Sequence, residues 1–210
     1  MVKSFRFADS NMFLTLLVAP TILLMFSLPL LQGAYAAESF KGLPFSVEIP
    51  DTWAYTETPD PPIEHVLGVT SYTSVVLVPV HFAELLIQET SDIVMSNGSA
   101  AIVFAKASDY SVKNAPLDLY VKYRMNEDKL LNVISHQDTI VGKEKAVRIE
   151  ASKNETSGNI KLLEYLLLHN NEPYVIRYIA GVNEFESYLP EFELMVKSFT
   201  FRENNTDTNS

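Results

Sequence analysis

Three short runs of the chain are apolar at nearly every position, and they restrict the possible folds more than any other feature. They are residues 101–105 (AIVFA), 162–168 (LLEYLLL) and 174–180 (YVIRYIA). A strand that is apolar on both faces must be covered on both faces. The polar link HNNEP between the second and third runs predicts a hairpin. We therefore expect one sheet enclosed between two covering layers.

Two further runs alternate between apolar and polar residues, which predicts half-buried strands. They are residues 45–49 (FSVEI) and 145–151 (KAVRIEA). Pro50 cannot donate a hydrogen bond to a neighbouring strand, so it is expected to end the first of them. Residues 74–80 also resemble a strand, but the pattern leaves the structure of 65–97 open.

Two segments carry apolar residues at helical spacing and are predicted to cover the sheet. The first begins after Asn114, the predicted N-cap, and has Pro116 in its first turn. Leu130 and Leu131 are expected to close this helix. Its apolar stripe consists of Leu117, Tyr120, Val121 and Met125.

The second predicted helix spans residues 188–199 (YLPEFELMVKSF), with Pro190 in its first turn. Glu191 and Glu193 lie near its positive end and Lys197 near its negative end, an arrangement that the helix dipole favours. Its apolar stripe consists of Tyr188, Leu189, Phe192, Val196 and Phe199.

The N-terminus has the pattern of an export signal. Lys3 and Arg6 precede an almost wholly apolar stretch, residues 12–31. Ala34 and Ala36 then form an A-x-A site, so cleavage is predicted after Ala36. The alternative is an uncleaved anchor, because about 20 apolar residues can span a bilayer. In either case the body of the protein is expected outside the cytoplasm, secreted or held at the outer face of the membrane.

Length and composition complete the domain organisation. We expect a signal peptide at 1–36, one domain at 37–202 and a polar, disordered tail at 203–210. The chain has 210 residues, no cysteine and a net charge of −10. Without cysteine there is no disulfide and no thiol chemistry, which favours a bacterial or archaeal source. The acidic body would repel phosphate backbones, so no nucleic acid is expected as a partner.

The chain's only tryptophan, Trp53, follows closely on Pro50. We expect the first strand to run to the end of the sheet, Pro50 to turn the chain outward, and Trp53 to fold back as an apolar plug. A tryptophan buries a large apolar area while its N–H finds an acceptor. The alternative is that Trp53 is an exposed anchor for a partner.

The order and spacing of these elements resemble the PsbP-like family, named for an extrinsic subunit of photosystem II. The most specific parts are residues 141–150 (VGKEKAVRIE), with Gly142 in a turn, and the closing 188–199. The resemblance covers roughly residues 40–202. It implies an α+β fold in which an antiparallel β-sheet is sandwiched between helices (an α/β/α sandwich).

The resemblance also implies a class of function. The best-known member of the family is a helper that docks on a membrane complex and supports its calcium and chloride cofactors. Prokaryotic members include surface proteins of unknown role. No local motif allows that helper's functional residues to be placed on this chain, and the chain has no twin-arginine thylakoid signal.

The sequence gives little support for a metal site. His65, His81, His136 and His169 are scattered, and no two of them have the i, i+4 spacing of an H-E-x-x-H motif. His136 and Asp138 would share one face of a strand, but two ligands are too few for a site, so we interpret them as solvated edge residues. We predict no metal-binding residue.

Calcium-binding and catalytic motifs are likewise weak or absent. The acidic stretches 126–129 and 183–193 lack the glycine of a calcium loop and are interpreted as solvated helix faces, so calcium remains a weak candidate. The chain contains no G-x-S-x-G, P-loop or G-x-G-x-x-G motif. We predict no catalytic and no cofactor-binding residue. Asn97, Asn154 and Asn204 head N-x-S/T sequons in predicted loops or the tail, so they are candidate glycosylation sites.

These observations favour an exported, non-enzymatic PsbP-like accessory or binding domain. It would act outside the cytoplasmic membrane and dock on a membrane or surface complex whose identity the sequence leaves open. One alternative is the outer domain of a single-span, signal-anchored membrane protein. Another is a secreted hydrolase that uses Ser, His and Asp residues distant in sequence.

Overall fold

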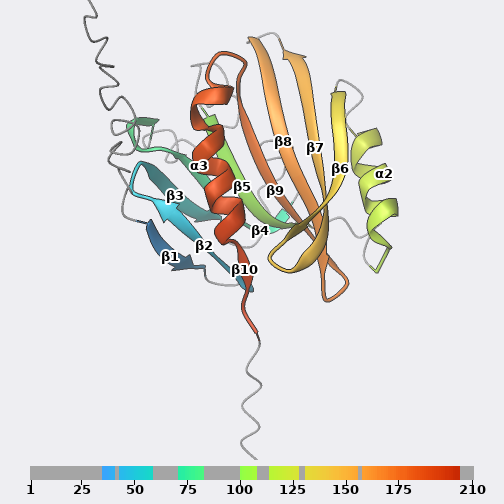
Figure 1. Ribbon diagram of the computed structural model, residues 1–210. Coiled ribbons are helices and arrows are strands. Elements are labelled where there is room, and N and C mark those ends of the chain that lie inside the picture. Colours follow the sequence, from blue (N-terminus) through green and yellow to red (C-terminus); the bar gives the residue numbers. More distant parts are fainter. Residues whose placement is uncertain are drawn as a thin grey trace, which may run out of the picture. The chain divides into compact units, whose positions relative to one another are not determined.

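The computed structural model describes residues 35–40, 43–58, 71–82, 100–107, 114–127, 131–155 and 158–203. All of them lie in one compact unit, Gly33–Ser210. Within these ranges the protein contains two antiparallel sheets and two helices (Figure 1). No described helix is long and apolar enough to cross a membrane.

The larger sheet has seven strands, and every neighbouring pair is antiparallel. The three apolar runs form its three central strands, as predicted, and are buried on both faces. In spatial order the strands are β3 (Trp53–Thr58), β4 (Ser71–Pro79), β5 (Ala100–Ala107), β9 (Glu172–Gly181), β8 (Gly158–His169), β7 (Glu144–Glu155) and β6 (Asn132–Val141).

Two tight turns set the register of four of these strands. The β8–β9 hairpin turns on Asn170 and Asn171, and the β6–β7 hairpin turns on Gly142 and Lys143. All four residues have positive φ, between 53° and 73°. A two-residue loop with positive φ at both positions is a type I′ turn, whose twist matches that of the flanking strands. The predicted hairpin and the turn at Gly142 are thus confirmed.

The smaller sheet corrects the expectation of a single β-layer. Its central strand is β2 (Phe45–Pro50), which pairs with β1 (Tyr35–Ser39) on one side and β10 (Thr200–Phe201) on the other. The strand at 45–49 exists as predicted, but it does not join the main sheet. The chain turns a corner at Asp51–Thr52 and enters the larger sheet at Trp53. The Val80 N–H closes this corner by donating to the Thr52 carbonyl, 2.8 Å away.

The first helix, α2 (Leu117–Glu127), starts later than predicted. The N–H groups of Leu119 and Tyr120 donate to the Pro116 carbonyl, so Pro116 occupies the cap position before the helix. Asn114 lies further out, with φ of 62°, and is not the N-cap. The predicted end was also too late, because Leu131 lies outside the helix and immediately before β6.

The second helix, α3 (Phe185–Ser198), begins nearly one turn earlier than predicted. Pro190 therefore lies inside the helix rather than in its first turn. The buried side of α3 adds Phe185 and Met195 to the predicted stripe. Its fully buried residues are Phe185, Phe192, Met195 and Val196, and Phe199 is buried directly after the last turn.

The two faces of the larger sheet are covered by different layers, which confirms the α+β sandwich. On one face, α3 and the smaller sheet pack together against β4, β5, β8 and β9 around Phe45, Phe104 and Phe199. On the other face, Tyr120 and Val121 of α2 pack against the same sheet. Figure 1 shows α3 and α2 on opposite sides of the larger sheet. The first layer is thus part helix and part sheet, whereas helices alone were expected.

Candidate functional site

The most unusual feature of the described residues is a charged pair inside the apolar centre of the larger sheet. Glu164 of β8 and Arg177 of β9 are directly opposite in the hairpin register. Both are buried, with 1% and 5% of their surface exposed. The Arg177 Nη2 donates to the Glu164 Oε1 over 2.8 Å. Both belong to the sheet face that α2 covers, where their neighbours in the cross-strand row are Val103 and Ile149.

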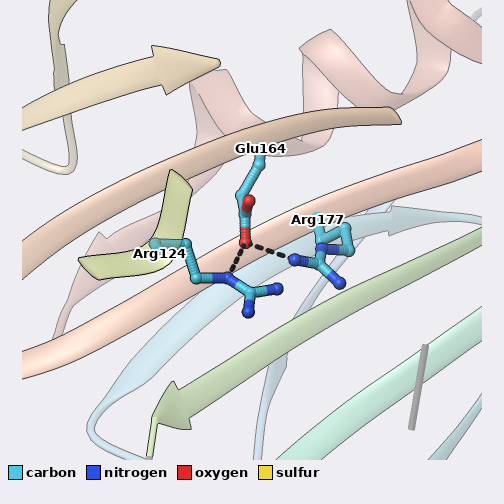
Figure 2. A network of polar contacts seen from close by, with 3 residues as sticks. All are labelled: Arg124, Glu164 and Arg177. Atoms are coloured by element: carbon cyan, nitrogen blue, oxygen red, sulfur yellow. Dashed lines mark hydrogen bonds and ion pairs between the residues drawn. The ribbon is translucent and has the colours of Figure 1, made fainter. Parts of the chain in front are cut away.

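A second arginine reaches the same carboxylate from the covering helix. The Nε of Arg124, in the last turn of α2, donates to the Glu164 Oε1 over 3.1 Å. Figure 2 shows the two guanidinium groups converging on this one oxygen atom. We call Arg124, Glu164 and Arg177 the buried charge cluster.

The geometry of the cluster points to a structural role. Removing three charged groups from water costs several kcal/mol for each ion, and this cost is offset only by good pairing. The pairing here links α2 to the two central strands of the hairpin. The cluster lies beneath α2 and within the apolar layer, and it requires the helix to sit at one position on the sheet.

The sequence contains a signal for this cluster, although the cluster was not among the predicted sites. Glu164 and Arg177 are the charged residues within two otherwise apolar runs, and they are equally distant from the turn at Asn170–Asn171. Arg124 continues the apolar stripe of its helix, because it follows Leu117 by seven residues. A charge at a core-facing position of each of three elements is the pattern that predicts a buried ionic contact.

Trp53 is buried, with 4% of its surface exposed, as the core interpretation predicted. Its ring packs edge-on against Tyr188, with centroids 5.7 Å apart. Its indole N–H donates to the Oε2 of Glu191 on α3. The expected geometry is corrected in one respect: Trp53 is the first residue of β3, opposite Pro79, rather than a plug beyond a strand end.

The described histidines lie apart from one another. His81 is exposed and its ring packs on Phe82, with centroids 4.1 Å apart. The His169 Nδ1 is 2.8 Å from the Glu144 Oε1, and its ring stacks on Phe201 of β10 with centroids 3.7 Å apart. His65 lies outside the described residues.

His136 and Asp138 lie on β6, the edge strand of the larger sheet, and both are exposed. They share one face of that strand, as predicted, because their partners Ile149 and Val147 belong to the same core cluster. Across the part of the chain that the structure describes, no three His, Cys, Asp or Glu side chains gather as metal ligands would.

The acidic stretch at 183–193 makes structural contacts. Glu186 of α3 pairs with Lys161 of β8 over 3.2 Å, and Glu191 accepts the Trp53 N–H as described above. The other acidic stretch, 126–129, is described only at Asn126 and Glu127, at the end of α2.

Two tyrosines in the core remain neutral well above physiological pH. Burial raises the pKa of Tyr174 and of Tyr178 far above the ordinary value of 10.0. Nearby acidic groups raise both pKa values further, Glu172 for Tyr174, and Tyr188 and Glu186 for Tyr178. The Tyr178 hydroxyl donates to the Phe185 carbonyl over 2.7 Å, which ties β9 to the start of α3.

The predicted processing sites fall partly within the described residues. The cleavage point after Ala36 lies inside β1, so a mature chain would keep residues 37–39 of that strand. Asn154 is exposed but lies near the end of β7, opposite Asn159, rather than in the predicted loop. Asn97 and Asn204 lie outside the described residues.

No family model and no curated protein matches this chain. Among solved structures, cyanobacterial PsbP from Synechocystis is similar with a TM-score of 0.51 at 10% identity, covering 80% of this chain and 93% of that chain. A Pseudomonas aeruginosa protein of unknown function has a TM-score of 0.45 at 13% identity, covering 79% and 96%. LpqN, which is involved in cell envelope biogenesis of Mycobacterium tuberculosis, has a TM-score of 0.38 at 8% identity, covering 80% and 91%.

The similarity to cyanobacterial PsbP supports the predicted resemblance at the level of the fold. It extends over nearly the whole of that protein and over four fifths of this chain. At 10% identity it defines the class of architecture and no more.

Proposed function

We propose that this chain is a PsbP-like accessory domain that acts outside the cytoplasmic membrane, without catalysing a reaction, by docking on a membrane or surface complex. The observation that carries the proposal is the fold similarity to cyanobacterial PsbP across 93% of that chain. The buried charge cluster and the contact of Trp53 with Glu191 support a binding rather than a catalytic role, because each holds one element to another. Export is supported by the N-terminal pattern of Lys3, Arg6 and the apolar residues 12–31.

The position of β1 matters for how the domain would be held. β1 starts at Tyr35, within the last two residues of the predicted signal peptide, and pairs with β2. If the segment is retained as an anchor, the smaller sheet is tethered next to the membrane. If cleavage occurs after Ala36, the domain is released with a shortened β1.

Export and cleavage are tested by N-terminal sequencing of the protein recovered outside the cytoplasm. We expect the sequence to start at Ala37. The variant Ala36→Glu should block processing, because signal peptidase requires a small residue there. The matched control Ala37→Glu should still be processed. An intact Met1 in the wild-type protein would establish the anchored alternative, and a wholly cytoplasmic protein would contradict the proposal.

Docking is tested with membranes from the source organism. We expect the tagged domain to bind them saturably, and to lose binding when the membranes are first treated with protease. Vesicles made from the extracted lipids alone are the control and should not bind. Equal binding to the protein-free vesicles, or none to the native membranes, would contradict docking on a protein complex.

We infer that the domain works without a bound cofactor, and calcium is the ion to check. A specific ion raises the melting temperature by mass action, so a titration with calcium should leave it unchanged if none is bound. A saturable rise with calcium and none with magnesium would overturn this inference.

A further inference from the structure

The outer edge of β6 is open among the residues that the structure describes. β6 is the last strand of the larger sheet, and β7 is its one partner in the described sheet order. Its ten residues include Ile134 and Ile140, which expose 52% and 72% of their surface. Proteins usually protect such an edge with lysine, proline or a bulge. β6 has no lysine or proline, and its irregularity is confined to the end near Val133–Ser135.

The sequence of β6 has the same chemistry when read in either direction. Residues 133–141 are VISHQDTIV, with Gln137 at the centre. Moving outward from Gln137, the matched positions hold a basic and an acidic residue, two hydroxyl residues, two isoleucines and two valines. These pairs are His136 and Asp138, Ser135 and Thr139, Ile134 and Ile140, and Val133 and Val141.

The hydrogen-bond pattern limits how two such edges can pair. The two-residue turn at Gly142–Lys143 closes on a hydrogen-bonded pair, Val141 with Glu144. Alternation along an antiparallel ladder then directs the backbone groups of Gln137 toward β7 and those of His136 and Asp138 outward. Two copies related by a two-fold axis can form backbone hydrogen bonds only where an outward-facing residue of one copy lies opposite an outward-facing residue of the other. An axis between two residues would place outward-facing residues opposite inward-facing ones. The axis must therefore pass through a residue position.

Three of the remaining registers, with the axis at His136, Gln137 or Asp138, pair β6 along most of its length, and side-chain chemistry distinguishes them. An axis at Asp138 would place two aspartates opposite each other, and an axis at His136 would place two histidines opposite each other. An axis at Gln137 places His136 opposite Asp138 of the second copy, twice by symmetry. The imidazole and the carboxylate can then hydrogen-bond across the strands, and such polar cross-strand pairs stabilise pairing. Ile140 of each copy then lies toward the irregular end of the other β6, which holds the exposed Ile134.

We propose that two copies of this chain associate through antiparallel pairing of their β6 strands, centred on Gln137. The contact is isologous, so it closes on itself and makes one continuous sheet through both copies. This inference is independent of the proposed function.

The charge around β6 permits this contact in an acidic protein. The whole chain carries a net charge of −10, which would oppose association through most of its surface. The β6–β7 hairpin from Asn132 to Glu150 is balanced at neutral pH. Its charged residues are Lys143, Lys145 and Arg148 against Asp138, Glu144 and Glu150.

A cysteine placed at the axis gives a position-specific test, since the chain has no cysteine of its own. In the proposed dimer the two Gln137 residues form a non-hydrogen-bonded pair, whose Cα atoms lie about 4.5 Å apart. That separation is within disulfide range. We expect the purified full-length Gln137→Cys protein to form a covalent dimer under mild oxidation.

The matched control is Thr139→Cys, whose partner position is Ser135 of the second copy. The two introduced thiols would then lie about 13 Å apart and should cross-link far more slowly. Cross-linking of Gln137→Cys at no more than the Thr139→Cys rate would overturn the proposal. Faster cross-linking of His136→Cys than of Gln137→Cys would overturn the register.

A charge exchange tests the same register by sedimentation equilibrium. His136→Asp places like charges opposite each other, and we expect the dimer Kd to rise about tenfold. Adding Asp138→His should restore wild-type affinity, because the pair is then reversed rather than lost.

Ile140→Lys should weaken the dimer, whereas Leu194→Lys, at an exposed position of α3, should not. A wild-type protein that stays monomeric up to its solubility limit, or a double variant as weak as His136→Asp, would contradict the pairing.

Discussion

Glu164 and Arg177 face each other in neighbouring central strands of the larger sheet, and their carboxylate and guanidinium atoms are 2.8 Å apart. Arg124 of α2 shares the same carboxylate oxygen. Glu164 and Arg177 are buried and the Arg124 side chain exposes 11% of its surface, so the shared carboxylate holds both arginines largely away from water.

Replacing Glu164 with Gln should be strongly destabilising. The change removes the negative charge that both guanidinium groups contact, and breaking a buried pair from one side costs about 3–5 kcal/mol. Urea unfolding should show this loss as a lower midpoint with an unchanged slope. Glu150→Gln is the control, since its more exposed contact with Arg148 is worth less than about 1 kcal/mol.

Replacing the whole buried charge cluster with apolar residues should recover much of that loss. The triple variant Arg124→Met, Glu164→Leu, Arg177→Met removes the desolvation cost together with the pairing, and such exchanges are often neutral or stabilising. Its free energy of unfolding should exceed that of Glu164→Gln. A triple variant less stable than the single one would show that the charges contribute more than mutual compensation.

The contact between Trp53 and Glu191 should be visible in fluorescence. Trp53 is the sole tryptophan, so its emission reports this one position. Glu191→Ala leaves the buried indole N–H without its acceptor, and we expect a loss of about 1–2 kcal/mol. The emission maximum should shift toward the red. Glu193→Ala, on the exposed side of the same helix, should change stability by less than about 0.5 kcal/mol and leave the emission unchanged.

Gly142 should not tolerate a side chain. Its φ is +56°, and a Cβ there would lie 3.0 Å from the Cδ1 of Phe199. Gly142→Ala should therefore cost about 1–3 kcal/mol through backbone strain and crowding. Lys143 has a φ of 73°, so Lys143→Gly in the same turn should be neutral or stabilising. The melting temperature should fall for Gly142→Ala and stay the same or rise for Lys143→Gly, and equal destabilisation would contradict this account of the turn.

The protein should lose stability in alkali because of its buried tyrosines. The pKa of Tyr178 is higher in the folded protein than its unfolded value near 10. The contribution of the neutral Tyr178 side chain to the free energy of unfolding is therefore fully present below pH 10. It is lost as the pH rises from there toward the pKa of the folded protein. Each such tyrosine adds a slope of up to about 1.4 kcal/mol per pH unit. Tyr178→Phe should show a shallower decline above pH 10, together with a loss of about 1 kcal/mol at neutral pH from the missing hydrogen bond to Phe185.

The central strands could be predicted because runs such as 162–168 and 174–180 are short, bounded by a polar turn and apolar on both faces, which is typical of strands covered on both faces. Their hairpin followed from the polar turn between them. The separate sheet could not be predicted, because alternation at 45–49 shows that one face is buried but not which strands lie beside it. The cap at Asn114 was wrong because a favoured residue type does not fix where helical geometry begins. In the structure α2 begins at Leu117 and α3 at Phe185.

Prediction of the site was uneven for a related reason. Trp53 could be assigned to the core from its size, whereas its acceptor Glu191 lies 138 residues away in sequence. The pairing of Glu164 with Arg177 could have been predicted, because the two residues are equally distant from the turn at Asn170–Asn171. Its link to Arg124 required the position of α2 on the sheet, which no local pattern contains.

The smaller sheet also determines when folding can finish. β2 lies between β1, from the beginning of the domain, and β10, which ends at Phe201. A ribosome releases the chain from its N-terminus onward, and Thr200 of β10 follows its β2 partner Ser46 by 154 residues, so β2 gains its second neighbour late. Phe199, which packs on Phe45, comes from the same late segment. The layer built on β2 therefore stays incomplete at the ribosome long after β2 itself has emerged, and it closes only when α3 and β10 have followed.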